Sequence, residues 1–109
     1  MIELHVSPAA CDELAKIGSY IARHSQTAAD RHQTQLYERM LGLVEQPMLG
    51  PARPEYGNGV RALSVGEYVI LYEITPSYIF VMHVIHGAQD IASLLRRPHD
   101  DRQPSKDAP

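Results

Sequence analysis

Apolar residues recur with a period of two along residues 60–85, the pattern of successive β-strands. The pattern predicts strands over 60–64, 68–74 and 78–85, joined by turns at 65–67 and 75–77. Such short connections favour an antiparallel meander. On the second strand one face carries Tyr68, Ile70, Tyr72 and Ile74, and the other carries Val69 and Leu71. On the third, Tyr78, Phe80, Met82 and Val84 alternate with Ile79, Val81 and Ile85. Both faces are therefore largely apolar, and another layer must cover at least one of them.

The residues before the meander predict a strand and two amphipathic helices. Alternation over 2–6 indicates a half-buried strand, and Ser7 before Pro8 is a typical start for a helix that runs to about His24. The spacing of Thr27 and Asp30 resembles a capping box, so a second helix is expected from there to Pro47. Its apolar stripe comprises Leu36, Met40 and Leu43, with Tyr37, Leu41 and Val44 beside them. The expected core comprises Leu14, Ile17, Ile21, Leu36, Met40, Leu43, Ile70, Tyr72, Phe80 and Val84.

Together these elements predict an α+β fold. An N-terminal strand and an antiparallel helical hairpin precede the β-meander, the hairpin packs on one face of the meander, and a short C-terminal helix follows. Residues 47–59 hold three prolines and three glycines and are expected to form a loop. The final helix is expected from Ile91 to Arg97, capped by Asp90 and stopped by Pro98. One domain over residues 1–97 would then precede a disordered tail over 98–109, which has no large apolar residue.

Composition and charge exclude several classes of protein. At 109 residues and 44% hydrophobic content, the chain is long enough for one domain and has no stretch that could span a membrane, so a cytoplasmic protein is expected. The net charge of −3 counts against binding nucleic acid through its backbone, and no direct nucleic-acid partner is expected. The single cysteine, Cys11, excludes an internal disulfide and is expected to be a buried thiol in the first helix.

The histidines give no firm catalytic or metal site. His83 and His86 are three residues apart, so a regular strand directs them to opposite faces, where they cannot share a metal. Either is suited to act as a general base, but a strand-end histidine bonded to the backbone is the commoner case. We therefore assign no catalytic residue, no metal ligand and no cofactor from the sequence.

The motifs taken together resemble a known family. They are an S-P-A-A-x-x-x-L-x-x-I-x-x-Y-I helix, P-M-L-G, R-A-L-x-x-x-x-Y-x-I-L-Y, and I-x-V-x-H-V-I-H-G-A-Q-D-I-A-S-L-L. In order and spacing they are similar to the ParE branch of the RelE/ParE toxins, from Ile2 to Leu95. The resemblance implies the toxin of a bacterial type II toxin–antitoxin pair, which inhibits DNA gyrase by binding. It also implies a cognate antitoxin, ParD-like or another small protein, that neutralises the toxin in a hetero-oligomer.

The RelE branch of the same family offers an alternative, cleavage of messenger RNA on the ribosome. That branch places several cations on the sheet, whereas Ala62 and Val69 stand at the matching positions here. Without cations to stabilise the charge on phosphate, cleavage is the weaker interpretation. The ParE pattern commonly has Arg-Asp where this chain has Gln89-Asp90, so the function of this turn is left open.

Candidate binding residues follow from the charges and from the second face of the meander. Arg61, Arg96 and Arg97 are the basic groups of the second half and suit contact with an acidic partner, although solvated charges fit them equally well. The second face is expected to lack a cover, which exposes Val69, Leu71 and either Ile79 or Val81 to a partner. We include Arg61, His86, Arg96, Arg97, Val69 and Leu71 in the expected target- or antitoxin-binding set.

Overall fold

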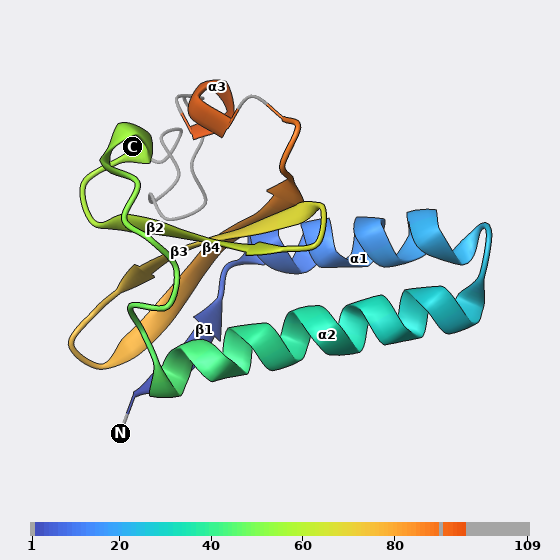
Figure 1. Cartoon of the computed structure of the whole chain (residues 1–109), viewed down its shortest axis with the longest axis horizontal. Coiled ribbons are helices and arrows are strands. Elements are labelled where there is room, and N and C mark those ends of the chain that lie inside the picture. Colours follow the sequence, from blue (N-terminus) through green and yellow to red (C-terminus); the bar gives the residue numbers. More distant parts are fainter. Residues whose placement is uncertain (1, 90, 96–109) are drawn as a thin grey trace, which may run out of the picture.

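A computed structural model describes residues 2–89 and 91–95 and shows a helical hairpin against a four-stranded sheet. The elements, in chain order, are β1 (Glu3–Val6), α1 (Pro8–Ala22), α2 (Gln26–Glu45), the 3₁₀ turn η1 (Pro54–Tyr56), β2 (Val60–Val65), β3 (Tyr68–Ile74), β4 (Tyr78–His86) and α3 (Ile91–Leu95). The sheet order is β1-β4-β3-β2, with β1 parallel to β4 and the other pairs antiparallel. In Figure 1 the two long helices lie side by side below the sheet, and α3 lies above it. The predicted α+β architecture is confirmed.

Two serines determine where the long helices begin. The Ser7 hydroxyl accepts the Ala10 N–H at 3.0 Å and donates to the Met82 carbonyl at 2.7 Å, so the cap of α1 also joins that helix to β4. For α2 the prediction was wrong by two residues. Ser25, not Thr27, is the cap, because its extended backbone lets its hydroxyl accept the Ala28 N–H at 3.1 Å. Thr27 therefore lies inside the first turn.

The buried residues between the hairpin and the sheet form the main core, which we call the helix-side core. Its members are Ala10, Leu36, Met40, Leu43, Leu63, Val65, Ile70, Tyr72, Ile79, Val81 and Val84. Phe80 was wrongly expected there. A register shift between β3 and β4 pairs Leu71 with His83 and Tyr72 with Val81, which leaves Met82 as an extra residue and reverses the alternation. Ile79 and Val81 therefore face the helices, and Phe80 faces away.

Four other side chains depart from the expected burial. Ile21 is only partly buried, and Tyr37 and Leu41 are 54% and 42% exposed, so the apolar stripe of α2 is narrower than predicted. Cys11 is exposed and not buried, because it lies on the outward side of α1 next to the buried Ala10.

The second face of the sheet has a cover, contrary to expectation. Val60, Ala62, Leu71, Met82, Ile85 and Ile91 form a second cluster there, against which Tyr56 of η1 and Leu94 and Leu95 of α3 pack. Leu71 is fully buried in this cluster, and Ile79 and Val81 are fully buried in the helix-side core. Only Val69 of the expected exposed set keeps partial exposure. The expected extension of α3 to Arg97 and the expected tail at 98–109 lie outside the described residues.

Candidate functional site

The second half of β4 has an edge that no strand of the described chain covers. β1 pairs with β4 only as far as Val6, opposite Val81, and the chain then turns into α1. Gly87 donates its N–H to the Glu67 carbonyl, on the side of β4 that faces β3. Successive N–H groups of a strand point to alternate edges, so those of Val84 and His86 point to the opposite, open edge. Hydrogen-bond donors at a sheet edge need partners.

Side chains provide these partners in place of a strand. Glu13 Oε1 accepts the Val84 N–H at 2.9 Å, and Gln89 Oε1 accepts the His86 N–H at 3.1 Å. Ser7 closes the start of the same edge through its bond to the Met82 carbonyl. The edge is thus capped by one side chain before α1, one within α1 and one in the turn after β4.

Glu13 is held at this edge by a second contact. Its Oε2 lies 2.9 Å from His83 Nδ1, and the two side chains are only 23% and 18% exposed. A carboxylate that bonds both a ring nitrogen and a backbone N–H fixes α1 to β4 over a separation of seventy residues in sequence. His83 therefore has a structural partner, but that partner is a carboxylate and not the backbone that the strand-end interpretation expected.

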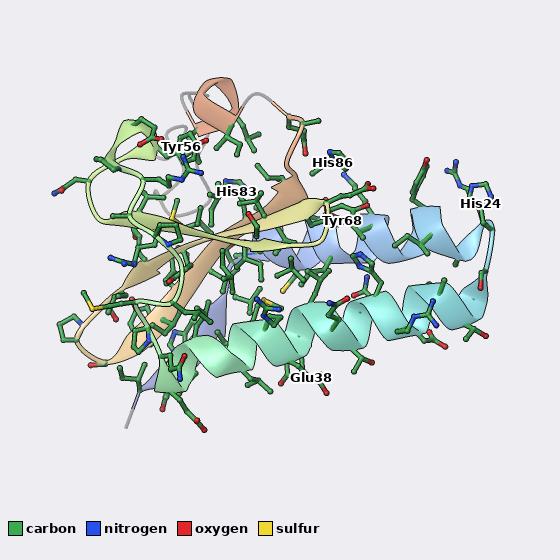
Figure 2. All side chains as sticks on the ribbon, in the orientation of Figure 1. His24, Glu38, Tyr56, Tyr68, His83 and His86 are labelled. Carbon is green, nitrogen blue, oxygen red and sulfur yellow. The ribbon has the colours of Figure 1, made fainter. Side chains whose placement is uncertain are left out.

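An aromatic cluster closes the end of the sheet beside this edge. The Tyr68 ring makes edge contacts with the rings of His32, at 5.0 Å between centroids, and of His86, at 5.5 Å. His86 Nε2 lies 3.3 Å from Glu67 Oε1, and Figure 2 shows Tyr68 and His86 together at this end of β4. Burial raises the pKa of Tyr68 above its ordinary value, and the Glu67 carboxylate and Tyr20 raise it further.

Two grooves meet at His86. The first, which we call the helix-side groove, encloses about 330 Å³ and runs along the open edge between α1 and β4. Its lining comprises Glu13, Lys16, Ile17, Tyr20, Tyr68, Val84, Ile85, His86, Gln89 and Leu94. The second, the hairpin-side groove, encloses about 400 Å³ between η1, the β2–β3 turn and the turn before α3. It includes Arg53, Tyr56, Glu67, Val69 and His86.

The structure distributes the sequence-predicted binding residues unevenly. His86 lines both grooves and Val69 lines one of them. Leu71 was expected to be exposed, which is wrong, since the second cluster buries it completely. Arg96 and Arg97 lie outside the described residues.

Arg61 has a structural task in the loop between α2 and β2. Its Nε donates to the Gly50 carbonyl at 2.7 Å and its guanidinium also reaches the Met48 carbonyl at 3.3 Å. The Tyr72 hydroxyl binds the same loop, donating to the Pro47 carbonyl at 2.6 Å and accepting the Gly50 N–H at 2.9 Å. A Cβ on Gly50 would lie 2.8 Å from the Ala62 carbonyl oxygen, which explains glycine at this position.

The grooves carry acid–base groups and few cations. Within residues 2–89 and 91–95, Lys16 is paired with Asp12 at 3.0 Å and Arg53 with Glu55 at 3.2 Å. The same residues hold no group of three or more side chains suited to a metal ion. No helix in the described part of the chain is long and apolar enough to cross a membrane. The arrangement is therefore suited to binding through apolar and hydrogen-bonding contacts.

Sequence reasoning missed Glu13, Glu67 and the capping role of Gln89. Glu13 and Val84 are seventy-one residues apart, and no local pattern reports such a contact. Gln89 did carry a signal, since it replaces the arginine that is common at this position in the resembled family.

Comparison with known proteins agrees with the fold. A family model described as the ParE toxin of the type II toxin-antitoxin system, parDE, matches residues 4–91. A solved structure described as the chromosomal ParDE TA system from P. aeruginosa superimposes with a TM-score of 0.69 at 19% identity, covering 79% of this chain and 96% of that one. No curated protein matches the chain.

Proposed function

The chain belongs to the ParE toxin family of type II toxin–antitoxin systems, and from this premise we propose that it inhibits DNA gyrase by binding and is neutralised by a cognate antitoxin. The observation that carries the proposal is the family match over residues 4–91, which spans both long helices and the whole sheet except the first residue of β1. Gyrase acts on the bacterial chromosome, so the proposal also requires a cytoplasmic location.

The chemistry of the grooves supports inhibition without catalysis. Cleavage of RNA needs a base for the 2′-hydroxyl, an acid for the leaving oxygen and cations for the charge on phosphate. His86, Tyr68 and Glu67 offer acid–base groups, and they are the specific reason to keep RelE-like messenger RNA cleavage as the alternative. Cations are scarce at the two grooves, where Lys16 and Arg53 are paired with carboxylates, and Arg61 of β2 bonds the loop before that strand.

Two assays on the purified chain separate the two functions. We expect inhibition of DNA supercoiling by gyrase, and no cleavage of messenger RNA on translating ribosomes. The reverse result would support the RelE-like alternative, and inactivity in both assays would overturn the proposal for gyrase.

Variants of the acid–base groups give the sharper test of mechanism. His86→Ala, His83→Ala and Tyr68→Phe, each checked for folding by circular dichroism, should inhibit gyrase within about tenfold of the parent. General acid–base groups supply about 10² to 10⁴ in rate, so a loss of about a hundredfold with unchanged binding would show that the activity is catalytic.

A further inference from the structure

We propose that the outer edge of β1 is a self-association surface, at which two copies of this chain pair their β1 strands in antiparallel orientation and join their sheets into one. β1 is the last strand in the sheet order. One of its edges pairs with β4, and the other has no strand beside it in the described residues. The inference does not depend on the proposed function, because neither gyrase nor an antitoxin takes part in it.

The backbone of β1 has unpaired hydrogen-bond donors at its outer edge. Glu3 and Ser7 donate their N–H groups to carbonyls of β4 and of the turn before it. Successive N–H groups of a strand point to alternate edges, so those of Leu4 and Val6 point outward. Within residues 2–89 and 91–95, neither of these two groups has an acceptor. The N–H groups at the open edge of β4 are covered by side-chain oxygens, whereas the outer edge of β1 remains available to a strand.

The sequence of β1 is self-complementary in one antiparallel register. When Leu4 pairs with Leu4 of the second copy, Ile2 of each copy pairs with Val6 of the other, and every outward N–H gains a carbonyl acceptor. The same register sets Glu3 of each copy opposite His5 of the other. Glu3 and His5 already bond each other within one chain at 3.0 Å, so the two side chains are suited to this contact. Registers shifted by two residues set Glu3 against Glu3 or His5 against His5, which disfavours them.

Exposed apolar side chains of α2 flank the same edge on the helix side of the sheet. Gln33 of α2 donates to the Leu14 carbonyl of α1 at 3.0 Å, which identifies the face of α2 that is turned to α1. Tyr37 and Leu41 follow Gln33 at intervals of four residues, so they lie on the same face, yet both are exposed. The two helices run antiparallel, so these positions lie toward the start of α1 and the end of β1, which packs on α2. Two-fold pairing brings them toward their counterparts in the second copy and shields them from water.

Charge and size favour a second copy as the occupant of this edge. The outward row offers a carboxylate and a histidine side by side, and a copy in the antiparallel register supplies the complement of each. A segment of uniform charge would match only one of them. The interface consists of residues 2–6 of each copy and a few helical side chains, so it belongs to the small, weak class, with a dissociation constant of about 10–100 μM.

Sedimentation velocity of the full chain alone tests the association. We expect the monomer at about 1 μM and predominantly the dimer at about 0.5 mM, as the expected dissociation constant requires. A monomer at every concentration in this range would overturn the proposal.

Amide hydrogen exchange measured by NMR identifies the surface. Between the dilute and the concentrated sample, exchange at Leu4 and Val6 should slow by at least about fivefold, because both N–H groups acquire acceptors. The amides of Glu3 and Ser7 already have acceptors within the fold and should change much less. A dimer in which exchange at Leu4 and Val6 is unchanged would overturn β1 as the interface. Slowing that occurs only after a different protein is added would assign the edge to that protein and overturn the proposal as well.

A charge swap tests the register. His5→Glu sets carboxylates opposite each other at both symmetry-related pairs and should weaken the dimer by about 3- to 30-fold. The double variant Glu3→His with His5→Glu places a histidine opposite a carboxylate again and should recover most of the loss. Circular dichroism verifies the fold of each variant, because His5 also stacks on Tyr78 at 4.2 Å between ring centroids. Both variants lack this stack, so the recovery measures the contact between copies.

His24→Glu is the matched control. It changes the charge of the chain by the same amount at an exposed histidine just after α1, and it should leave the dissociation constant of the dimer within about twofold of the parent value. If His24→Glu weakened the dimer as much as His5→Glu, or if the double variant failed to recover while folded, the proposed register would be overturned.

Discussion

Ile70 is fully buried at the centre of the helix-side core, where β3 meets the helical hairpin. Truncation to alanine removes a large side chain from a packed site, so Ile70→Ala should lower the free energy of unfolding by about 2–5 kcal/mol. Urea denaturation measures the loss. Ile74→Ala on the same strand is the matched control, because Ile74 is 40% exposed and should cost much less. A loss below about 1 kcal/mol for Ile70→Ala would contradict its place in the core.

Tyr68 gives a prediction for the pH dependence of stability. Its pKa in the folded chain is raised above 10.0 by burial, by Glu67 and by Tyr20. From pH 10 up to the raised pKa, the unfolded chain has lost this proton and the folded chain retains it, so stability falls with rising pH in that window. Below pH 10 both states are protonated and the contribution is complete.

The measurement compares the parent chain with Tyr68→Phe. The difference in their free energies of unfolding should be constant from pH 8 to pH 9.5 and should decrease above pH 10, because phenylalanine has no proton to lose. Absorbance of the tyrosinate provides an independent titration. If the difference in the free energy of unfolding increased at pH values above 10, the raised pKa of Tyr68 would be contradicted.

The hydrogen bonds of Arg61 could not be predicted from the sequence. As one of the basic groups of the second half, Arg61 was a candidate for contact with an acidic partner, but its guanidinium donates to the carbonyls of Gly50 and Met48. The loop of residues 47–51 brings those carbonyls to the strand, and a composition rich in proline and glycine predicts a loop without predicting its path.

The caps of the two long helices give a paired prediction for whole elements. Ser25→Ala removes one cap bond and should lower the free energy of unfolding by about 1 kcal/mol. Ser7→Ala should lower the free energy of unfolding by at least about 1 kcal/mol more than Ser25→Ala does. The reason is that Ser7 is buried and also donates a hydrogen bond to the Met82 carbonyl. Thermal denaturation of the two variants side by side measures the difference. Equal losses would show that the bond to β4 contributes nothing.

Periodicity predicted the positions of the strands and helices closely, but it did not predict which side chains of β4 face the helices. All four strands and both long helices were predicted within about two residues, since hydrophobic period and cap residues are local signals. The extra residue at Met82 reverses the alternation within β4, and a bulge has no sequence signature in a continuous apolar run. Phe80 was therefore assigned to the wrong face.

At the scale of the molecule, the sequence predicted which layers exist but not everything that each layer covers. The helical hairpin packs on the sheet as its apolar stripes indicated. The second face of the sheet is covered by η1 and α3. These two elements have only eight described residues together, so their hydrophobic pattern is too short to indicate which face packs on the sheet. The site along β4 depends on Glu13, Gln89 and the end of β1, so it exists only once the chain is assembled.

The charge of the whole molecule leads to a prediction for the affinity of the antitoxin. The chain carries a net charge of −3, and Lys16, Arg53 and Arg61 are engaged within the fold. Lys16 is the cation among the residues that line the helix-side groove, so an acidic antitoxin finds little positive charge there, and apolar contacts along the groove should supply most of the binding free energy. Salt screens exposed charges and leaves apolar contacts largely unaffected, so raising the salt from about 0.05 M to 0.5 M should weaken binding by less than about tenfold. Calorimetric titration at four salt concentrations measures this slope. A loss of several orders of magnitude would show that arginines carry the contact, and Arg61→Ala, Arg96→Ala and Arg97→Ala would then identify which of them does.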